Sequence, residues 1–494
     1  MEVAKEVLQI AHILKQEGHS AYLVGGCLRD LLLNKEPNDW DLTTDAKPEE
    51  IQKIFPESVY ENEFGTVGVK TDSEDPRLKI VEVTTFRIEE GYSNKRHPDS
   101  VSFSTDINDD LSRRDFTVNA IALDLNANDP ITDPFEGQKD LKDEVLRAVG
   151  DPDQRFKEDA LRLLRAVRFS AQLDFAIEQE TFKAIKENAA LLEHVSKERI
   201  RIEFEKLIMT DKAEQALILL QELGLLQYII PELEEGVGVE QNMHHKYTVF
   251  EHNVKSLGYA VKQNMPLELR LAALLHDVGK PATREWKDYA KGEKIKDGKK
   301  GDWTFYSHQV VGAKMTEKIL RRLTFPAKLI EKVSLLVYEH MFVYDPDAVT
   351  LAGVRRLISR VGKENMEDLI LLREADRIGS GVPKAQPYRL RHLQAMVEKV
   401  STDPVSVKML KVNGQDLMSA GVEPGPKMGD ILDILLQEVI ENPEKNEKEA
   451  LLARVKELDK MNENELSKMA HQAQETATKK QEEIDEDIKK KYFV

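Results

Sequence analysis

The chain has 494 residues, more than one hydrophobic core usually holds, so several domains are expected. A hydrophobic fraction of 41% supports folded domains, and no apolar run approaches the roughly 20 residues that cross a bilayer. The formal charge of −18 argues against indiscriminate nucleic-acid binding, and the single cysteine excludes an intrachain disulfide. We therefore expect a cytoplasmic protein without a membrane partner.

Helix and strand patterns are mixed up to about residue 142. A helix is predicted for residues 3–16, and β-branched or alternating residues predict strands at 21–24, 41–43, 66–71 and 79–86. After residue 151 the strand signal almost disappears, and helical periodicity continues to about residue 460. The expected fold class is α+β, with a mixed α/β head followed by an elongated all-α region.

The segment LVGGCLRDLLLNKEPNDWDLTT combines a Gly-Gly turn, at the start of a predicted helix, with two aspartates. Gly25 and Gly26 lack side chains, so their backbone N–H groups can approach a triphosphate where the helix begins. If the following residues form a strand, Asp39 and Asp41 point to the same side, which suits Mg²⁺. An ordinary turn and a solvated acidic pair are the alternatives.

Two further residues extend this candidate site. Arg29, on the same predicted helix, offers a fixed fork of donors for phosphate oxygens. Glu82 lies in the predicted strand KIVEVTTF, where the alternation of side chains allows it to face the site from a neighbouring strand. It is a candidate third carboxylate, and a glutamate facing water from an edge strand is the equally open alternative.

Three later segments follow in order: RRDFTVNAIALD at 113–124, DPFEGQKDL at 133–141 and RFKEDALRLLRAVRF at 155–169. With the first segment, they make residues 20–455 resemble the class II tRNA nucleotidyltransferase and bacterial poly(A) polymerase family. The resemblance implies addition or repair of the 3′-terminal CCA of tRNA from CTP and ATP, by two-metal nucleotidyl transfer with Mg²⁺ in the head.

The candidate residues of this reaction fall into two groups. The catalytic carboxylates are Asp39, Asp41 and Glu82, of which the two aspartates are metal ligands. The nucleotide-binding residues are Gly25, Gly26, Arg29, Arg113, Arg114, Asp115, Asn119, Glu158, Asp159, Arg162, Arg165 and Arg168.

Residues 156–169 are predicted as one helix, in which Asp159 and Arg162 are spaced i, i+3 and lie on one face. In the resembled family these positions select the incoming base. Cytosine and adenine each present an amine donor beside a ring-nitrogen acceptor, which a carboxylate and a guanidinium complement, whereas uracil and guanine do not. The alternative is a surface helix whose ion pairs contribute little energy.

Three other segments also resemble parts of this family. FRIEEGYSNKRHPDSVSF, residues 86–103, resembles the family's flexible loop, which is tied to addition of the final adenosine. KERIRIEFEKLI, residues 197–208, is closer to the nucleotidyltransferase branch than to the polymerase branch. Residues 410–446 resemble the tail that embraces the tRNA elbow.

The segment LRLAALLHDVGKPAT places a His-Asp pair at the end of an apolar helix. Each histidine alone is typical of a core or surface position, but the ordered set resembles an HD-type phosphohydrolase domain. That resemblance implies a divalent transition metal such as Mn²⁺ or Ni²⁺, or Mg²⁺, and hydrolysis of a phosphoester. The candidate metal ligands are His252, His276, Asp277, His308, His340 and Asp376.

Five segments are expected along the chain. They are the catalytic head (1–142), a helical neck that reads the base and binds RNA (143–235), the HD-type domain (236–380), a helical tRNA-binding tail (381–460) and a charged tail, helical or disordered (461–494). The Lys-rich stretch 291–302 is interpreted as a flexible insertion between helices.

Other functions are compatible with parts of the sequence. A poly(A) polymerase of the same fold is the nearest alternative. A metal-dependent phosphohydrolase with an RNA-binding head and a non-enzymatic RNA-binding scaffold are two more. The intact Asp39, Asp41 and EDALR positions disfavour the phosphohydrolase. The scaffold is disfavoured because both sets of metal-ligand residues are complete.

Overall fold

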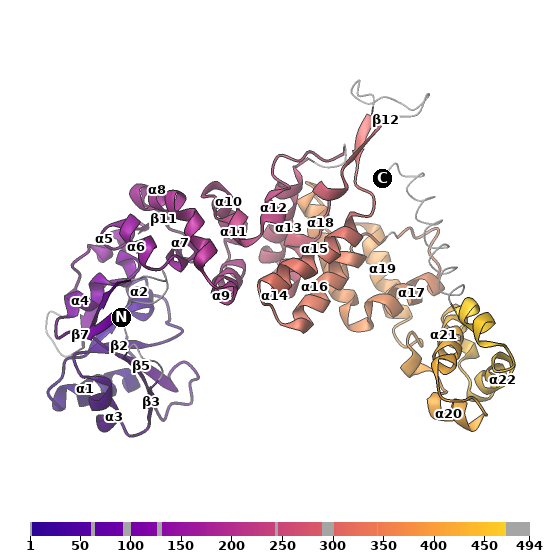
Figure 1. The fold of residues 1–494 in the computed structure, drawn as a ribbon, viewed down its shortest axis with the longest axis horizontal. Helices are drawn as coiled ribbons and strands as arrows, with labels where there is room; N and C mark the ends of the chain where they lie inside the picture. Colours follow the sequence, from indigo (N-terminus) through magenta and orange to yellow (C-terminus); the bar gives the residue numbers. More distant parts are fainter. Residues whose placement is uncertain are drawn as a thin grey trace. The chain divides into compact units, whose positions relative to one another are not determined.

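The computed structural model describes residues 2–60, 65–91, 100–125, 131–242, 246–288, 301–342 and 344–470 (Figure 1). The chain divides into two compact units. The first comprises Met1–Glu234 with Arg322–Thr324, and the second comprises Glu235–Arg321 and the chain from Phe325 onward. A mixed sheet lies in the first unit and helices dominate the rest, so the predicted α+β class is confirmed.

The head is built on a seven-stranded sheet in the order β3-β4-β5-β2-β1-β8-β9. Neighbours are antiparallel except β2 and β5, which run parallel. Burial along β5 alternates residue by residue, as a strand with one covered face requires. The strands are β1 (Tyr22–Val24), β2 (Asp41–Thr44), β3 (Ser58–Tyr60), β4 (Thr66–Lys70), β5 (Ile80–Thr85), β8 (Ala122–Asp124) and β9 (Ile131–Thr132).

Helices of the first unit also bury one face. On α1, for example, Val7, Ile10, Ala11 and Leu14 are buried at helical spacing. The helices are α1 (Lys5–Gln16), α2 (Gly25–Leu32), α3 (Pro48–Ile54), α4 (Ile107–Ser112), α5 (Gly137–Lys142), α6 (Pro152–Glu158), α7 (Leu161–Leu173), α8 (Gln179–Asn188), α9 (Lys197–Ile208), α10 (Ala213–Glu222), α11 (Leu226–Ile229) and α12 (Pro231–Glu234).

The prediction of one helix over residues 156–169 is wrong, because the chain breaks between α6 and α7. Asp159 has an extended backbone, with φ −134° and ψ 105°. Its Oδ1 accepts the N–H of Leu161 at 3.1 Å, and its backbone carbonyl accepts the N–H of Arg162 at 3.0 Å. Aspartate competes in this way with helical hydrogen bonding, so it ends one helix and begins the next.

Helices also form the second unit. They are α13 (Val249–Lys262), α14 (Leu267–Leu275), α15 (His308–Arg322), α16 (Ala327–Glu339), α17 (Leu351–Val361), α18 (Met366–Gly379), α19 (Tyr388–Lys399), α20 (Gly414–Ser419), α21 (Pro426–Glu441) and α22 (Lys448–Leu458). A separate core that begins at Leu410 includes Leu466 and Ala470. The first residues of the predicted charged tail are therefore packed rather than solvated, and residues 471–494 lie outside the described chain.

Three strand pairs lie outside the main sheet: β6 (Arg87–Glu90) with β7 (Ser100–Phe103), β10 (Val145–Leu146) with β11 (Ala176–Ile177), and β12 (Glu285–Asp288) with β13 (Gly301–Thr304). The last pair departs from the expected all-helical region. Trp286 and Trp303 face each other across it, and such cross-strand aromatic pairs stabilise hairpins. Most of the Lys-rich insertion and the centre of the loop expected at 86–103 lie outside the described residues.

Among the helices in the described segments, none has the length and apolar character needed to cross a membrane.

Replacing Phe116 with alanine should destabilise the first unit by about 3–5 kcal/mol, because a fully buried aromatic ring leaves a cavity. The Phe116 ring also packs edge-on against Phe169, with centroids 5.8 Å apart. Denaturant unfolding of the purified protein measures the change. Met209→Ala, at a position 44% exposed, is the matched control and should shift stability by less than about 0.5 kcal/mol. Equal effects of the two variants would contradict this packing.

Candidate functional site

The Gly-Gly turn brings the start of α2 against two charged side chains. Gly25 begins α2 with φ +73°, a conformation that glycine adopts without strain. A Cβ at this position would lie 3.1 Å from Nη1 of Arg114 and 3.4 Å from Oδ2 of Asp41. The backbone at the helix N-terminus therefore lies against a carboxylate and a guanidinium, and its predicted contact with phosphate stays a prediction.

Two of the three predicted carboxylates lie on neighbouring parallel strands, and the third precedes one of them. Asp41 begins β2 and lies in register with Glu82 on β5, and Asp39 precedes Asp41 by two residues. Burial raises the pKa of Asp41 to about 7, the negative charges of Asp39 and Glu82 add to this, and Arg114 opposes it. A carboxylate among other carboxylates is stabilised by a cation, and oxygen ligands are those that Mg²⁺ prefers. The chemistry of these oxygen donors thus suits a divalent cation.

Arg114 is held beside this cluster by the preceding helix. Its Nη2 lies 3.1 Å from Oδ2 of Asp110, a fully buried residue on α4. Arg113 binds the other oxygen of Asp110 and lies 3.4 Å from Glu89 on β6. Sequence reasoning missed Asp110, although its position three and four residues before two arginines is a recognisable helical ion-pair spacing.

The Arg29 guanidinium is buried and does not point into solvent, where it could bind phosphate directly. It is only 3% exposed, and it donates to Oδ1 of Asn119 at 2.8 Å and to Oδ1 of Asp30 at 2.7 Å. Asn119 in turn donates to Asp115 at 3.1 Å. In this structure Arg29 fixes the orientation of Asn119, and a direct contact with nucleotide stays a prediction.

Asp115 links the head to α7. Its Oδ2 accepts two hydrogen bonds from Arg165, at 2.6 and 2.8 Å. Burial opposes a charge on Asp115, yet Arg165 and Asn119 lower its pKa far below the ordinary value. Arg168 is also buried, binds Glu203 at 2.6 Å and stacks over the Phe169 ring at 3.8 Å. Arg165 and Arg168 therefore bind carboxylates of the protein itself. Their predicted contacts with nucleotide stay predictions.

The two predicted base-reading residues have different partners. Asp159 binds Arg199 of α9 through both carboxylate oxygens. Arg162 binds Glu158 at 2.7 Å and donates to the backbone carbonyls of Arg155 and Arg113. The expected i, i+3 neighbours on a single helix are thus separated by the α6–α7 break.

Sequence reasoning also missed the role of α9. Arg199 and Glu203 lie one turn apart on this helix and hold Asp159 and Arg168 respectively. Glu203 is 4% exposed and sits among the buried Ile200, Phe204 and Leu207. A glutamate within the apolar face of a predicted helix was the available signal, since buried charges require partners.

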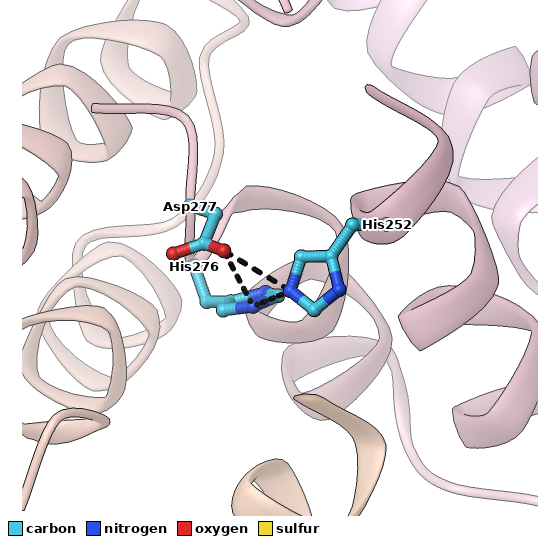
Figure 2. Close-up of side chains that lie close together, drawn as sticks. All are labelled: His252, His276 and Asp277. Carbon is cyan, nitrogen blue, oxygen red and sulfur yellow. Dashed lines mark hydrogen bonds and ion pairs between the residues drawn. The ribbon is translucent and has the colours of Figure 1, made fainter. Parts of the chain in front are cut away.

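The side chains predicted for the second site lie close together. His252 of α13 points toward His276 and Asp277 at the end of α14, and Figure 2 shows these three side chains converging. His252 Nε2 lies 2.8 Å from His276 Nε2 and 3.0 Å from Asp277 Oδ2. Asp376 of α18 completes this group, 3.4 Å from His252 Nε2.

Asp277 also faces a second group. Its Oδ1 lies 3.2 Å from Nε2 of His308 and 3.6 Å from Nε2 of His340. Two sets of potential ligands therefore share one aspartate: His252, His276 and Asp277 in one, and Asp277, His308 and His340 in the other. The close packing of Gly279 on α15 keeps His308 near, since a Cβ on Gly279 would lie 2.4 Å from the His308 carbonyl oxygen.

Hydrogen bonding around the histidines favours metal ligation. Nδ1 of His276, His308 and His340 lies 2.9, 2.7 and 2.6 Å from a backbone carbonyl oxygen, which only accepts. Each Nδ1 therefore carries a proton, and in the neutral ring Nε2 presents its lone pair to the cluster. In their neutral forms, His308 and His340 direct two Nε2 lone pairs at each other across 3.3 Å, an arrangement that a cation between them would stabilise.

Ionisation within the cluster is uneven. Burial lowers the pKa of His340 to about 4, so this ring is neutral near neutral pH. Burial also opposes a charge on His276, but Asp277 and Asp376 raise its pKa to about 10. Lys280, which sequence reasoning did not single out, is 6% exposed and lies 2.6 Å from Asp277 Oδ2.

Comparison with known families matches three parts of the chain. The family model of the poly(A) polymerase head domain matches residues 21–147. A model described as the probable RNA- and SrmB-binding site of polymerase A matches residues 174–236. The model of tRNA nucleotidyltransferase domain 2 matches residues 298–455.

Individual relatives extend the match. The CCA-adding enzyme of Geobacillus sp. (strain WCH70) is 46% identical over 229 residues, 46% of this chain and 55% of that protein, so this alignment spans about half the relative's length. The CCA-adding enzyme of Ligilactobacillus salivarius (strain UCC118) is 33% identical over 458 residues, 92% of this chain and 96% of that protein. The crystal structure of the Bacillus stearothermophilus CCA-adding enzyme in complex with CTP superposes with a TM-score of 0.66 at 30% identity, covering 92% of this chain and 96% of that chain. With relatives matched along nearly its whole length, the chain belongs to the class II CCA-adding enzyme family.

Proposed function

We propose that this chain is a template-independent tRNA nucleotidyltransferase that adds or repairs the 3′-terminal CCA of tRNA, with CTP and ATP as substrates. The proposal rests on the close approach of Gly25, Asp41 and Arg114 at the start of α2, in a chain that aligns with a CCA-adding enzyme over 92% of its length. These substrates imply a cytoplasmic location. Full-length relatives named as CCA-adding enzymes favour this function over the poly(A) polymerase alternative.

The head residues have distinct tasks in the proposed reaction. The backbone at Gly25 and Gly26 and the N-terminus of α2 bind the triphosphate, and Arg114 adds positive charge. Asp39 and Asp41, with Glu82 beside them, would hold Mg²⁺. When bound, the cation supplies charge stabilisation for the attacking 3′-oxygen and the leaving pyrophosphate.

Base choice is assigned to Asp159 and Arg162. The Asp159 carboxylate accepts from the exocyclic amine of cytosine or adenine, and the Arg162 guanidinium donates to the ring nitrogen. The three hydrogen bonds that hold Arg162 use at most three of its five N–H groups. Uracil and guanine would place a carbonyl opposite the carboxylate, and the unpaired polar groups that result disfavour them.

Domain limits follow from the same proposal. We assign the head to residues 1–142, the neck to 143–235, the HD-type domain to 236–380, the tRNA-binding tail to 381–460 and the charged tail to 461–494. The boundary between the two compact units at Glu235 supports the limit between the neck and the HD-type domain.

The decisive assay supplies each nucleoside triphosphate, singly and together, to a tRNA that lacks its 3′-terminal CCA. Ordered addition of C, C and A followed by a stop supports the proposal. A long adenosine tail would select a poly(A) polymerase instead.

Asp39→Ala and Asp41→Ala should each reduce nucleotide addition by at least about a hundredfold, because the cation loses a ligand at the reacting phosphate. Chelation of divalent cations should stop the wild-type reaction. Asp75→Ala is the control, since Asp75 pairs with Arg77 outside the site and its loss should leave addition unchanged. Retained activity in both Asp39 and Asp41 variants would exclude this carboxylate site.

A second activity is favoured by the buried histidine cluster. We propose that the domain around His276 and Asp277 is an HD-type metal-dependent phosphohydrolase. The shared aspartate and the inward-facing Nε2 atoms support it. His252, His276, Asp277, His308, His340 and Asp376 would hold a divalent metal such as Mn²⁺, Ni²⁺ or Mg²⁺. When bound, such a metal supplies a water molecule activated against a phosphoester.

Metal analysis tests the ligand assignment without any assay of activity. The wild-type protein, loaded with Mn²⁺ or Ni²⁺ and desalted, should retain metal, and the double variant His276→Ala, Asp277→Ala should lose it because two central ligands are removed. His12→Ala is the control, since His12 is exposed and lies on α1. Equal metal content in wild type and double variant would count against the site.

Hydrolysis should be separable from nucleotide addition. Loaded with the metal, the wild-type protein should release phosphate or alcohol from a synthetic phosphoester, and His276→Ala with Asp277→Ala should not. Asp41→Ala should hydrolyse normally, because the two sets of ligands lie in different compact units. A chain that binds metal but hydrolyses neither a phosphomonoester nor a phosphodiester would restrict this site to a structural role.

A further inference from the structure

Arg199 holds the carboxylate that is assigned to base choice. Its Nη2 lies 2.7 Å from Oδ2 of Asp159, and its Nη1 lies 3.2 Å from Oδ1. Two parallel contacts fix both the position and the plane of a carboxylate, which one contact cannot do. The Asp159 and Arg199 side chains are 17% and 24% exposed, so the pair is partly shielded but reachable from solvent.

The contacts leave Oδ2 of Asp159 with room for one more donor. Oδ1 already accepts from Arg199 and from the backbone N–H of Leu161 at 3.1 Å. Oδ2 accepts from Arg199. A carboxylate offers about four lone-pair sites, so one lone pair of Oδ2 is left for a group outside this network. The exocyclic amine of cytosine or adenine is a donor of the required kind.

Arg162 has its own supports, Glu158 and two backbone carbonyls, so it is not the residue that orients Asp159. The α6–α7 break places Asp159 outside regular helix. The backbone N–H of Leu161 holds only Oδ1, so Oδ2 is held by a neighbour from another part of the chain. Arg199 of α9 is that neighbour, and Glu203 one turn further along braces Arg168 in the same way.

We propose that Arg199 is a positioning residue for nucleotide selection: it presents Oδ2 of Asp159 to the exocyclic amine of the incoming base. This inference rests on the proposed nucleotidyltransferase function and on the assignment of Asp159 to base choice. Arg199 acts through Asp159, so its loss should affect the choice among nucleotides more than the rate with the correct nucleotide.

Helix α9 does not need Arg199 to stay in place. Ile200, Phe204, Leu207 and Ile208 are all fully buried, and their apolar contacts anchor the helix. An Arg199→Ala variant is therefore expected to fold. Arg201, two residues on, pairs with Glu205 of the same helix at 2.7 Å and provides a matched control on α9.

The test compares kcat/KM for CTP and UTP on tRNA that lacks CCA, and for ATP and GTP on tRNA that ends in CC. Arg199→Ala should lower both C-over-U and A-over-G preference by about tenfold or more, the size expected when a charge-assisted hydrogen bond loses its alignment. Arg199→Lys, which keeps the charge but not the two-point contact, should give an intermediate preference. Arg201→Ala should leave both preferences unchanged, and thermal unfolding checks that every variant is folded.

Asp159→Ala separates failure of this inference from failure of the proposed function. If Asp159→Ala loses selectivity but Arg199→Ala lowers kcat equally for all four nucleotides, Arg199 is only structural and the inference is overturned. Full selectivity in Arg199→Lys would overturn the two-point orientation.

If Asp159→Ala itself keeps selectivity, the assignment of Asp159 to base choice is wrong and the inference fails with it. In the double variant, the two losses should not add, because both residues act through one contact.

Discussion

A set of buried arginine–carboxylate pairs connects the sheet of the head to the helices that follow it. Asp115 receives two hydrogen bonds from Arg165 of α7, and Glu203 of α9 binds Arg168. Buried charges are costly unless they are paired and hydrogen-bonded, so these contacts hold only in a narrow range of geometry. They align the start of α7 with the segment that carries Arg114. In the proposed reaction, the distance between the phosphate site and the base-reading residues depends on this alignment.

The two candidate metal sites differ in chemistry as well as in place. The head offers carboxylate oxygens on neighbouring parallel strands, with Asp41 and Glu82 in register. The second unit offers imidazole nitrogens from several helices around the shared Asp277. Oxygen ligands suit Mg²⁺, whereas imidazoles suit transition metals, so one chain could carry both without competition for the same ion. The ligands also differ in burial, since the histidines are almost fully enclosed and Asp39 is exposed.

Several features of the fold were predictable because they depend on local pattern. Alternation in KIVEVTTF predicted β5, and helical spacing of apolar residues predicted α1. The ordered His and Asp residues of the second site also came together, and each lies at or near the end of a helix. The break at Asp159 was not predictable in the same way, because the apolar period continues through it. There, a single side chain hydrogen-bonding to the backbone outweighs helix propensity.

The sequence by itself determined the residue types of both candidate sites, the α+β class and the family resemblance, since these depend on composition, period and motif order. Only the tertiary structure decided which charged groups meet. It paired Asp159 with Arg199 rather than Arg162, and it turned Arg29 inward to Asn119. It also placed one aspartate between two groups of histidines. Such pairings join residues far apart in the chain, and they are set by the packing of helices and strands, which no local spacing encodes.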